Sequence, residues 1–351
     1  MEKDERKELL DWLKDYKEYK TLRNLKWELF EKLPNPPVTF YGESAIRLSL
    51  QQPKWRVPYA IQNKVLVEGA TTGAFYRRDE NPKQPYKPEE TRDATMACIE
   101  AGATAVHLHV RDVNTGMPSY EVEEYEKIVN PIRDKYGSKV FIDGCCVYGP
   151  TFEETMLPVK YQKFEMTPIN ATAVYCGEML LAIPPQYLIM QTLYCEKYGV
   201  KPMIALYDTG DIDNARRWLI EPGIAKKPIY WNVLPSIPGC SPMPNAKAMC
   251  ESMLFFLNRI LEMDPDPMIL VSVAGRASSF FAALSVILGC HIRVGTEDTT
   301  YKYPHRDDPL EEASWAVGNA VDLVHDLGLE VASADDLRKA IGIEYPPKKV
   351  K

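Results

Sequence analysis

The chain has 351 residues, of which 45% are hydrophobic and 26% charged, and its formal net charge is −7. It is long enough to bury a full core, and an acidic balance without a clustered basic face argues against a nucleic-acid-binding protein. The sequence contains no apolar run of about 18 residues, so we expect no membrane-spanning helix and small molecules as partners.

The eight cysteines include no C-x-x-C pair, and the sequence starts with Met-Glu-Lys-Asp rather than a signal peptide. We therefore expect a cytoplasmic protein with free thiols. Most of these cysteines lie in apolar segments, which favours ordinary buried thiols. The neighbouring Cys145 and Cys146 follow a predicted strand, so a pocket position is the alternative for this pair.

The first 33 residues carry leucines and tyrosines at three- and four-residue intervals, with Glu and Lys between them. This spacing predicts an amphipathic helical segment, which the prolines at 34–37 end. The segment is too short to fold alone, so we expect it to pack on the main domain or on a neighbouring subunit. We divide the chain into a helical N-terminal extension, residues 1–62, and a main domain, residues 63–351.

From residue 64 onward, short apolar runs alternate with stretches of helical periodicity. The expected strands are residues 65–70, 104–109, 140–143, 165–170, 202–207, 229–234, 268–273 and 291–295. Eight strands, each followed by a helical stretch, predict an α/β fold, a (β/α)8 TIM barrel. An open doubly wound sheet is the alternative, but the glycine-rich turn typical of that fold is absent after the first strand.

Two histidines end the second predicted strand. Side chains two apart on a strand share a face, so His107 and His109 point the same way. This spacing is typical of half a metal site, and it fits equally a pair of core histidines bonded to backbone. The best candidate for a third ligand is Glu297, after the last predicted strand. Two histidines and one glutamate would leave open positions for substrate, as a catalytic metal requires.

Three motifs resemble those of one known family. They are Val-Glu-Gly-Ala-Thr-Thr-Gly-Ala at 67–74, Glu-Ala-Gly-Ala at 100–103 leading into Val-His-Leu-His-Val-Arg-Asp at 106–112, and Gly-Cys-His-Ile-Arg-Val-Gly-Thr-Glu-Asp at 289–298. In these motifs the chain resembles the β-keto acid cleavage enzymes. The resemblance spans about residues 63 to 344 and leaves the N-terminal extension outside.

The resemblance implies a zinc-dependent barrel, usually a homotetramer. Such an enzyme condenses a β-keto acid with acetyl-CoA and releases acetoacetate and a new acyl-CoA. Carried over by motif, the zinc ligands are His107, His109 and Glu297, and Arg293 and Asp298 form the catalytic dyad. The metal would polarise the ketone, and Asp298 would be the base. A structural ion pair is the alternative for the dyad.

The chain departs from the family at residues we expect to bind substrate. Phe75 stands where the enzymes acting on 3-keto-5-aminohexanoate have a glutamate, which implies a different substrate. After the third strand, Cys145 stands where the family often has a serine. After the fourth strand, Ala173 stands where the family usually has a threonine, and Thr172 lies next to it.

Two carboxylates, on the first and third predicted strands, are further departures from the family. Glu68 and Asp143 are either substrate or metal contacts, or partners of Arg111 or Arg77 in salt bridges. Arg276, after the seventh strand, is a candidate for binding the phosphates of coenzyme A; a scattered surface cation is the alternative.

Three functions follow from this reading. The first is the zinc-dependent cleavage of a β-keto acid with acetyl-CoA. The second keeps the metal but acts as a CoA-independent carbon–carbon lyase or hydrolase on a related keto acid, for which the changes at residues 75, 145 and 173 leave room. The third is an inactive scaffold paralogue. The retention of all five expected metal and dyad residues weighs against the third.

Overall fold

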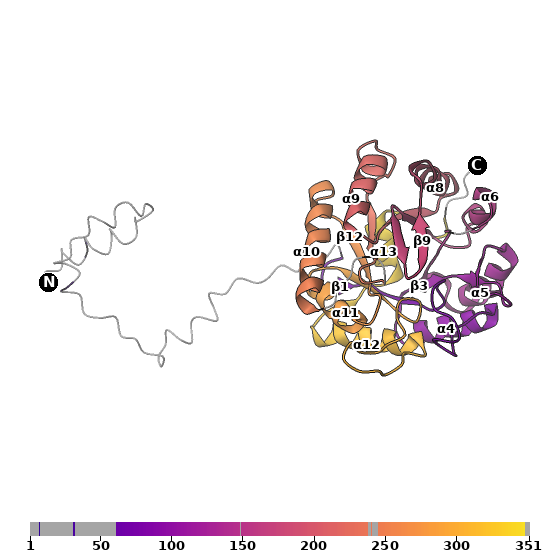
Figure 1. Ribbon diagram of the computed structural model, residues 1–351, viewed down its shortest axis with the longest axis horizontal. Helices are drawn as coiled ribbons and strands as arrows, with labels where there is room; N and C mark the ends of the chain where they lie inside the picture. The colour runs from indigo at the N-terminus through magenta and orange to yellow at the C-terminus, as the bar shows by residue number, and fades with distance from the viewer. Residues whose placement is uncertain are drawn as a thin grey trace. The chain divides into compact units, whose positions relative to one another are not determined.

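A computed structural model describes residues 61–147, 149–237, 240 and 245–347, together with the isolated positions 7 and 31. The predicted helical segment at the N-terminus lies almost entirely outside the described residues. The described part includes all eight predicted strands of the barrel (Figure 1). None of its helices is long and apolar enough to cross a membrane.

Eight strands close into one parallel barrel, in which sequence neighbours pair and β13 returns to β2. Their bounds are β2 Val67–Ala70, β3 Ala105–Leu108, β6 Phe141–Gly144, β7 Met166–Asn170, β10 Lys201–Leu206, β11 Tyr230–Val233, β12 Met268–Ser272 and β13 His291–Val294. Each matches a predicted strand, so the (β/α)8 barrel is confirmed.

The strands are apolar on both faces because each face is covered. Val67, Val106 and Val271 belong to the large core cluster between the strands and the outer helices. Leu66, Ala105 and Phe141 belong to a second cluster, which fills one end of the barrel interior. Since side chains two apart share a face, the next inward layer of the same strands carries polar side chains. This second layer begins the candidate site.

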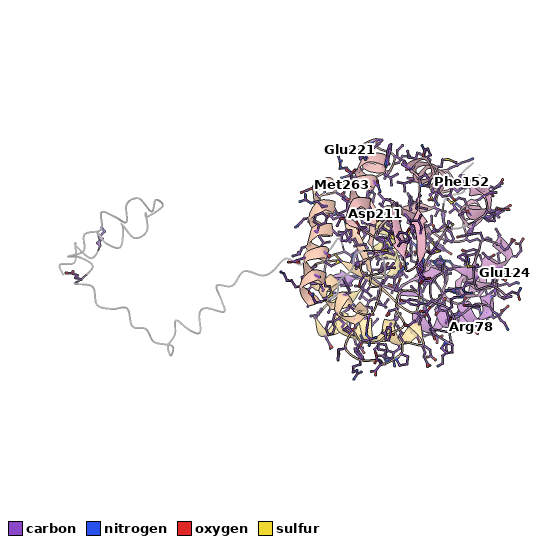
Figure 2. The ribbon with its side chains drawn as sticks, viewed as in Figure 1. Arg78, Glu124, Phe152, Asp211, Glu221 and Met263 are labelled. Atoms are coloured by element: carbon purple, nitrogen blue, oxygen red, sulfur yellow. The ribbon has the colours of Figure 1, made fainter. Side chains whose placement is uncertain are left out.

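Helices surround the barrel. Their bounds are α4 Pro88–Glu100, α5 Val122–Tyr136, η3 Gly137–Lys139, α6 Phe152–Thr155, α7 Leu157–Lys160, α8 Pro185–Tyr198, α9 Thr209–Ala215, η4 Arg216–Ile220, α10 Ala246–Met263, α11 Ser278–Ile287, α12 Ala313–Asp326 and α13 Ala334–Ile341. Glu124 on α5 and Glu221 after η4 lie at the outer edge in Figure 2. The polar faces of the helices meet solvent, while their apolar faces pack on the strands.

Helix α13 closes the amino-terminal end of the barrel. Its Leu337 and Ile341 join the cluster formed by the first inward layer of the strands. Arg338 lies on the same helix and pairs with the buried Glu165, with Nε 2.6 Å from Oε2. One end of the barrel is thereby filled, so access to the interior is from the carboxyl ends of the strands.

Three short sheets accompany the barrel. They are the parallel pair β1 Lys64–Val65 and β14 Glu330–Val331, and two antiparallel pairs, β4 Val110–Arg111 with β5 Pro118–Ser119 and β8 Ala173–Cys176 with β9 Met179–Ala182. The β8–β9 hairpin follows β7 and was not predicted. It lies at the open end of the barrel and supplies part of the cavity wall described below.

Candidate functional site

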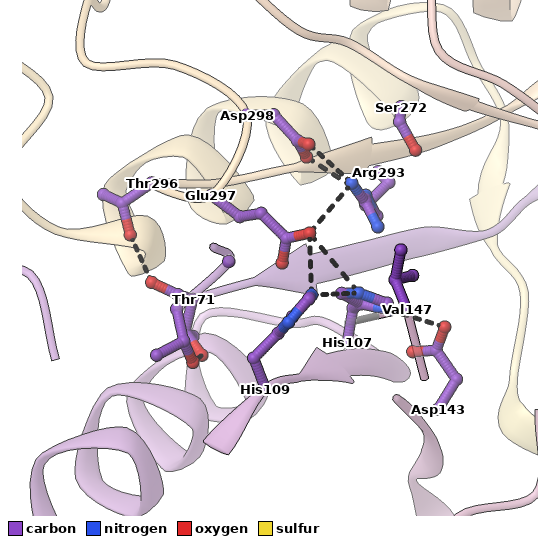
Figure 3. A network of polar contacts seen from close by, with 12 residues as sticks. Thr71, His107, His109, Asp143, Val147, Ser272, Arg293, Thr296, Glu297 and Asp298 are labelled. Carbon is purple, nitrogen blue, oxygen red and sulfur yellow. Dashed lines mark hydrogen bonds and ion pairs between the residues drawn. The ribbon is translucent and has the colours of Figure 1, made fainter. Parts of the chain in front are cut away.

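His107 and His109 converge at the carboxyl end of β3. His107 is in the strand and His109 comes directly after it, so both rings turn into the barrel. Their Nε2 atoms are 3.1 Å apart, and both side chains are buried (Figure 3). Their ring contacts are to each other and to acidic side chains rather than to backbone. The geometry favours the half-site over the pair of core histidines.

Glu297 reaches the same point from the loop after β13. Its Oε1 lies 3.4 Å from Nε2 of His107 and 3.3 Å from Nε2 of His109. Its Oε2 is buried without a hydrogen-bond partner. Two imidazole nitrogens and one carboxylate oxygen are a donor set that suits a divalent transition metal, with positions left for other ligands. The three residues therefore fit the metal that the sequence predicts.

Asp143, at the carboxyl end of β6, orients the first histidine. Its Oδ2 lies 2.8 Å from Nδ1 of His107, so a proton on Nδ1 leaves Nε2 free to face Glu297. Burial lowers the pKa of His107, but the charges of Asp143 and Glu297 outweigh burial and raise it to about 10. Burial lowers the pKa of His109. The two rings therefore differ in their affinity for a proton.

Arg293 and Asp298 form a buried ion pair beside the three residues. Nη2 and Nε of Arg293 lie 2.5 Å and 3.1 Å from the two carboxylate oxygens of Asp298, and Nη2 is 3.3 Å from Oε1 of Glu297. Burial raises the pKa of Asp298 to about 6, against the lowering effect of Arg293. For Glu297 burial acts in the same direction, but His107 and Arg293 outweigh it and hold the pKa well below its usual range.

Glu68 lies deeper, on β2. It is fully buried, and neither of its carboxylate oxygens has a hydrogen-bond partner. Burial, with the nearby Asp143, raises its pKa well above the usual range. One of its oxygens lies within 4.8 Å of ligand atoms of both His107 and Asp143. The alternative prediction was a salt bridge from Glu68 to Arg111 or Arg77. Instead, Arg111 donates to the carbonyls of Thr72 and Gly73, and Arg77 donates to the carbonyl of Thr115.

Two cavities open at this end of the barrel. The inner cavity, of about 30 Å³, is lined by Ala74, Phe75, His107, His109, Cys145, Val147, Pro168, Asn170, Leu181, Ala205, Tyr207, Asn232, Leu234, Arg293 and Glu297. The outer cavity, of about 640 Å³, shares Ala74, Phe75 and Glu297 with it and includes Arg77, Glu80 and Glu178. The candidate metal ligands thus lie at the base of a narrow space that widens toward solvent.

The predicted substrate residues fall in different places. Phe75 and Cys145 line the inner cavity. Glu68, Asp143 and Thr172 are buried and line neither cavity, so their contact with substrate stays a prediction.

Arg276 lies on the loop after β12. It is partly exposed, forms an ion pair with Asp307 and donates to the carbonyls of Pro304 and Arg306. Its role toward coenzyme A also stays a prediction.

Three polar residues of the inner cavity were not predicted from the sequence as site residues. Asn170, Tyr207 and Asn232 sit at or just after the ends of β7, β10 and β11. The hydroxyl of Tyr207 donates to Oδ1 of Asn170 at 2.9 Å, and Ser272 donates to Oδ1 of Asn232 at 2.9 Å. The signal available was their inward register at strand ends, where barrels gather their functional groups.

A closed parallel barrel with two histidines and a glutamate converging at the carboxyl end of its strands defines a barrel protein with a candidate metal centre. Comparison with known families identifies it further. The model of the beta-keto acid cleavage enzyme family matches residues 64–343, and the chain belongs to this family. The membership predicted from the three motifs is confirmed.

The relatives act on chemically different keto acids. The chain is 29% identical over 283 residues to a 3-keto-5-aminohexanoate cleavage enzyme of Acetoanaerobium sticklandii, covering 80% of this chain and 98% of that one. It is 23% identical to a 3-dehydrocarnitine:acetyl-CoA trimethylamine transferase of Rhizobium meliloti, covering 81% and 98%. It is 25% identical to a 3-oxoadipate:acetyl-CoA acetyltransferase of Cupriavidus necator, covering 79% and 94%. These relatives are thus named for the cleavage of a keto acid or for a transfer that involves acetyl-CoA.

A solved structure supports the fold. The ternary complex of ObcA with a C4-CoA adduct and oxalate superimposes with a TM-score of 0.63 at 16% identity, covering 75% of this chain and 68% of that one. At this identity the likeness concerns the barrel alone.

Proposed function

We propose that this chain is a zinc-dependent enzyme that converts a β-keto acid and acetyl-CoA into acetoacetate and a new acyl-CoA, with a substrate other than 3-keto-5-aminohexanoate. The observation that carries the proposal is the convergence of His107, His109 and Glu297 beside the buried pair of Arg293 and Asp298. Two nitrogens and one oxygen suit zinc, and a three-residue set leaves room for a chelating keto acid. When bound, the ion polarises the ketone.

Asp298 is the base. It removes a proton from C2 of the keto acid, the carbon between the ketone and the carboxylate. C2 bonds to the acetyl carbon of acetyl-CoA, and the sulfur of coenzyme A leaves with the electron pair. That sulfur then bonds to C3, the bond between C2 and C3 breaks, and the proton returns from Asp298 to C2. The products are an acyl-CoA and acetoacetate, so atoms and charge balance.

Arg293 serves the same step. Its guanidinium holds Asp298 by two hydrogen bonds, which fixes the carboxylate in one orientation. The pair is buried, so water does not compete for the proton. The inner cavity holds the keto acid, with Phe75 and Cys145 on its wall, and the outer cavity receives the arm of coenzyme A. We also propose that Glu68, Thr172 and Asp143 support the substrate and that Arg276 contacts a phosphate of coenzyme A.

We extend the proposal to a cytoplasmic homotetramer. The described cysteines are free, and seven of the eight are buried, which suits a reducing compartment. The tetramer rests on the family resemblance, and light scattering of the full chain measures it directly. A mass of one, two or three subunits would rule it out.

The test combines metal content with turnover. Purified protein is expected to hold about one zinc per chain, and His107→Ala and Glu297→Ala are each expected to remove it. His325→Ala, which changes an exposed histidine on α12, is the matched control and should keep the metal. The holoenzyme, given a panel of β-keto acids with acetyl-CoA, should release acetoacetate and an acyl-CoA in equal amounts. Product formation without acetyl-CoA would instead point to the lyase or hydrolase, and metal-free wild-type protein would contradict the proposal.

A further inference from the structure

The inner cavity has charged side chains at its bottom and uncharged side chains around its wall. Its charged lining side chains are His107, His109, Glu297 and Arg293. The first three are the proposed metal ligands, and Arg293 is already bonded to Asp298 and Glu297. Among the residues that the structure describes, the rest of this lining is uncharged. A charge on the far end of a substrate would therefore meet no opposite charge inside this cavity.

The wall is built by apolar side chains from four separate segments. Phe75 follows β2, Val147 follows β6, Leu181 lies on β9, and Leu234 follows β11. These four residues, which we call the apolar wall, belong to a single hydrophobic cluster. Leu181 and Leu234 are 2% and 4% exposed, so the cluster is closed on the side away from the cavity. A charged group lodged against it would lose its hydration without compensation.

Apart from the proposed metal ligands and Arg293, the polar groups of the cavity are neutral. Oδ1 of Asn170 accepts from Tyr207, while Oδ1 of Asn232 accepts from Ser272. The Nδ2 atom of Asn232 is buried without a partner and can donate to an oxygen of a keto acid. These groups suit the ketone and carboxylate that every β-keto acid carries. They offer little to an ammonium or to a second carboxylate.

We infer that the substrate is a β-keto acid with a short, uncharged, apolar chain beyond the ketone. The inference rests on the proposed function, since it takes the metal and dyad as the anchor for the ketone and the carboxylate. Apart from the proposed metal ligands and the dyad, the charged side chains that line the two cavities, Arg77, Glu80 and Glu178, all lie in the outer one. The inner cavity is much the smaller of the two, about 30 Å³ against about 640 Å³, which limits the chain to a few carbons.

Three probes with the same six-carbon skeleton separate charge from size. They are 3-oxohexanoate, 5-amino-3-oxohexanoate, which adds an ammonium, and 3-oxoadipate, which adds a carboxylate. With saturating acetyl-CoA, kcat/KM of the zinc-loaded enzyme for 3-oxohexanoate should exceed that for either charged probe by about 100-fold. Calorimetric titration of the same three acids, without acetyl-CoA, should give the same order of affinities.

Variants at Phe75 test whether the apolar wall sets this order. Phe75→Leu keeps an apolar side chain and should keep the preference for the neutral acid. Phe75→Glu places a carboxylate on the wall and should raise kcat/KM for the amino acid probe relative to 3-oxohexanoate by at least tenfold. Since Phe75 is half-buried at the cavity rim, thermal unfolding of both variants checks that the barrel still folds.

The outcomes separate the two claims. Turnover or binding of a charged probe as good as that of 3-oxohexanoate would overturn the inference and leave the proposed reaction standing. Tighter binding of 3-oxohexanoate supports the inference even if no acyl-CoA forms, in which case only the proposed reaction fails. An unchanged order in Phe75→Glu, with the variant folded, would count against the wall as the determinant.

Discussion

The Nδ1 atom of His107 lies 2.8 Å from Oδ2 of Asp143, and both side chains are fully buried. A carboxylate in this position holds the imidazole in one orientation and makes Nε2 a stronger ligand. We predict that Asp143→Asn weakens zinc binding by about 10- to 100-fold, since an amide accepts the hydrogen bond but lacks the charge. Competition with a chromophoric chelator measures the dissociation constant.

Asp213→Asn is the control for the loss of one carboxylate. Asp213 is partly exposed on α9 and pairs only with Arg216 and Arg217 on the surface among its described contacts. Its replacement should leave the zinc dissociation constant unchanged. Equal affinities in Asp143→Asn and the wild type would show that the buried contact does not support the metal.

Zinc binding should strengthen as the pH rises. In the metal-free protein, the carboxylates of Asp143 and Glu297 outweigh burial and raise the pKa of His107 to about 10. Below that pKa the ring carries two protons, so a metal must displace one of them from Nε2. For one proton released, the association constant should increase about tenfold for each pH unit between pH 6.5 and 9.

Titrations in buffers of different ionisation enthalpy count the protons released. About one proton per zinc is expected at pH 7.5. An association constant that does not vary with pH over this interval would mean that His107 is neutral before the metal binds. Asp143→Asn removes one of the two charges that raise the pKa, so its pH dependence should level off at a lower pH than that of the wild type.

Gly73 fits against the third proposed ligand. Its φ of +58° is a left-handed conformation, and a Cβ there would lie 3.0 Å from Cβ of Glu297 and closer still to its Cγ. Gly73→Ala should therefore displace Glu297 and weaken zinc binding at least tenfold, besides the strain of about 1 kcal/mol that a left-handed alanine costs. Zinc titration and urea unfolding measure the two effects separately.

Gly137, the residue after α5, provides the matched control. Its φ is +57°, and a Cβ would meet no atom within 4 Å. Gly137→Ala should lower the free energy of unfolding by at least about 1 kcal/mol, since its ψ of −129° lies outside the left-handed helical region, and leave zinc binding intact. If both alanine variants bind zinc as the wild type does, the contact with Glu297 is not needed to hold that ligand.

The barrel was predictable because its strands are covered on both faces. Such strands appear in the sequence as mainly apolar runs. The run at 104–109 contains His107 and His109, and the run at 291–295 comes directly before Glu297 and Asp298. The two-residue spacing placed His107 and His109 on one face. The N-terminal extension lies almost entirely outside the described residues, so the domain boundary at 62 stays a prediction.

The cavity wall was not predictable in the same way. Leu181 and Leu234 are ordinary leucines in the sequence, and only the packing of the β8–β9 hairpin against the end of β11 makes them neighbours. Tyr175 and Leu180 on that hairpin are large hydrophobic residues that are more than half exposed. The hairpin therefore lacks the alternation of apolar and polar residues that would predict two strands. Glu68 and Asp143 fall on predicted strands, but their depth below the cavity depends on the register of the neighbouring strands.

The last prediction concerns the proposed base. Burial raises the pKa of Asp298 to about 6, against the lowering effect of Arg293. A base must be ionised, and the positive charge of bound zinc lowers the pKa of the neighbouring Asp298, so kcat/KM of the zinc-saturated enzyme should rise with pH below about 6 and stay level above it. Asp298→Asn should lower kcat/KM by about 10²- to 10⁴-fold and abolish this rise, while the zinc content stays at the wild-type value. Asp326→Asn, at an exposed position on α12, is the control and should keep the wild-type profile. An Asp298→Asn enzyme that retains the same pH profile would assign the proton transfer to another group, and loss of its zinc would make Asp298 a support of the metal rather than the base.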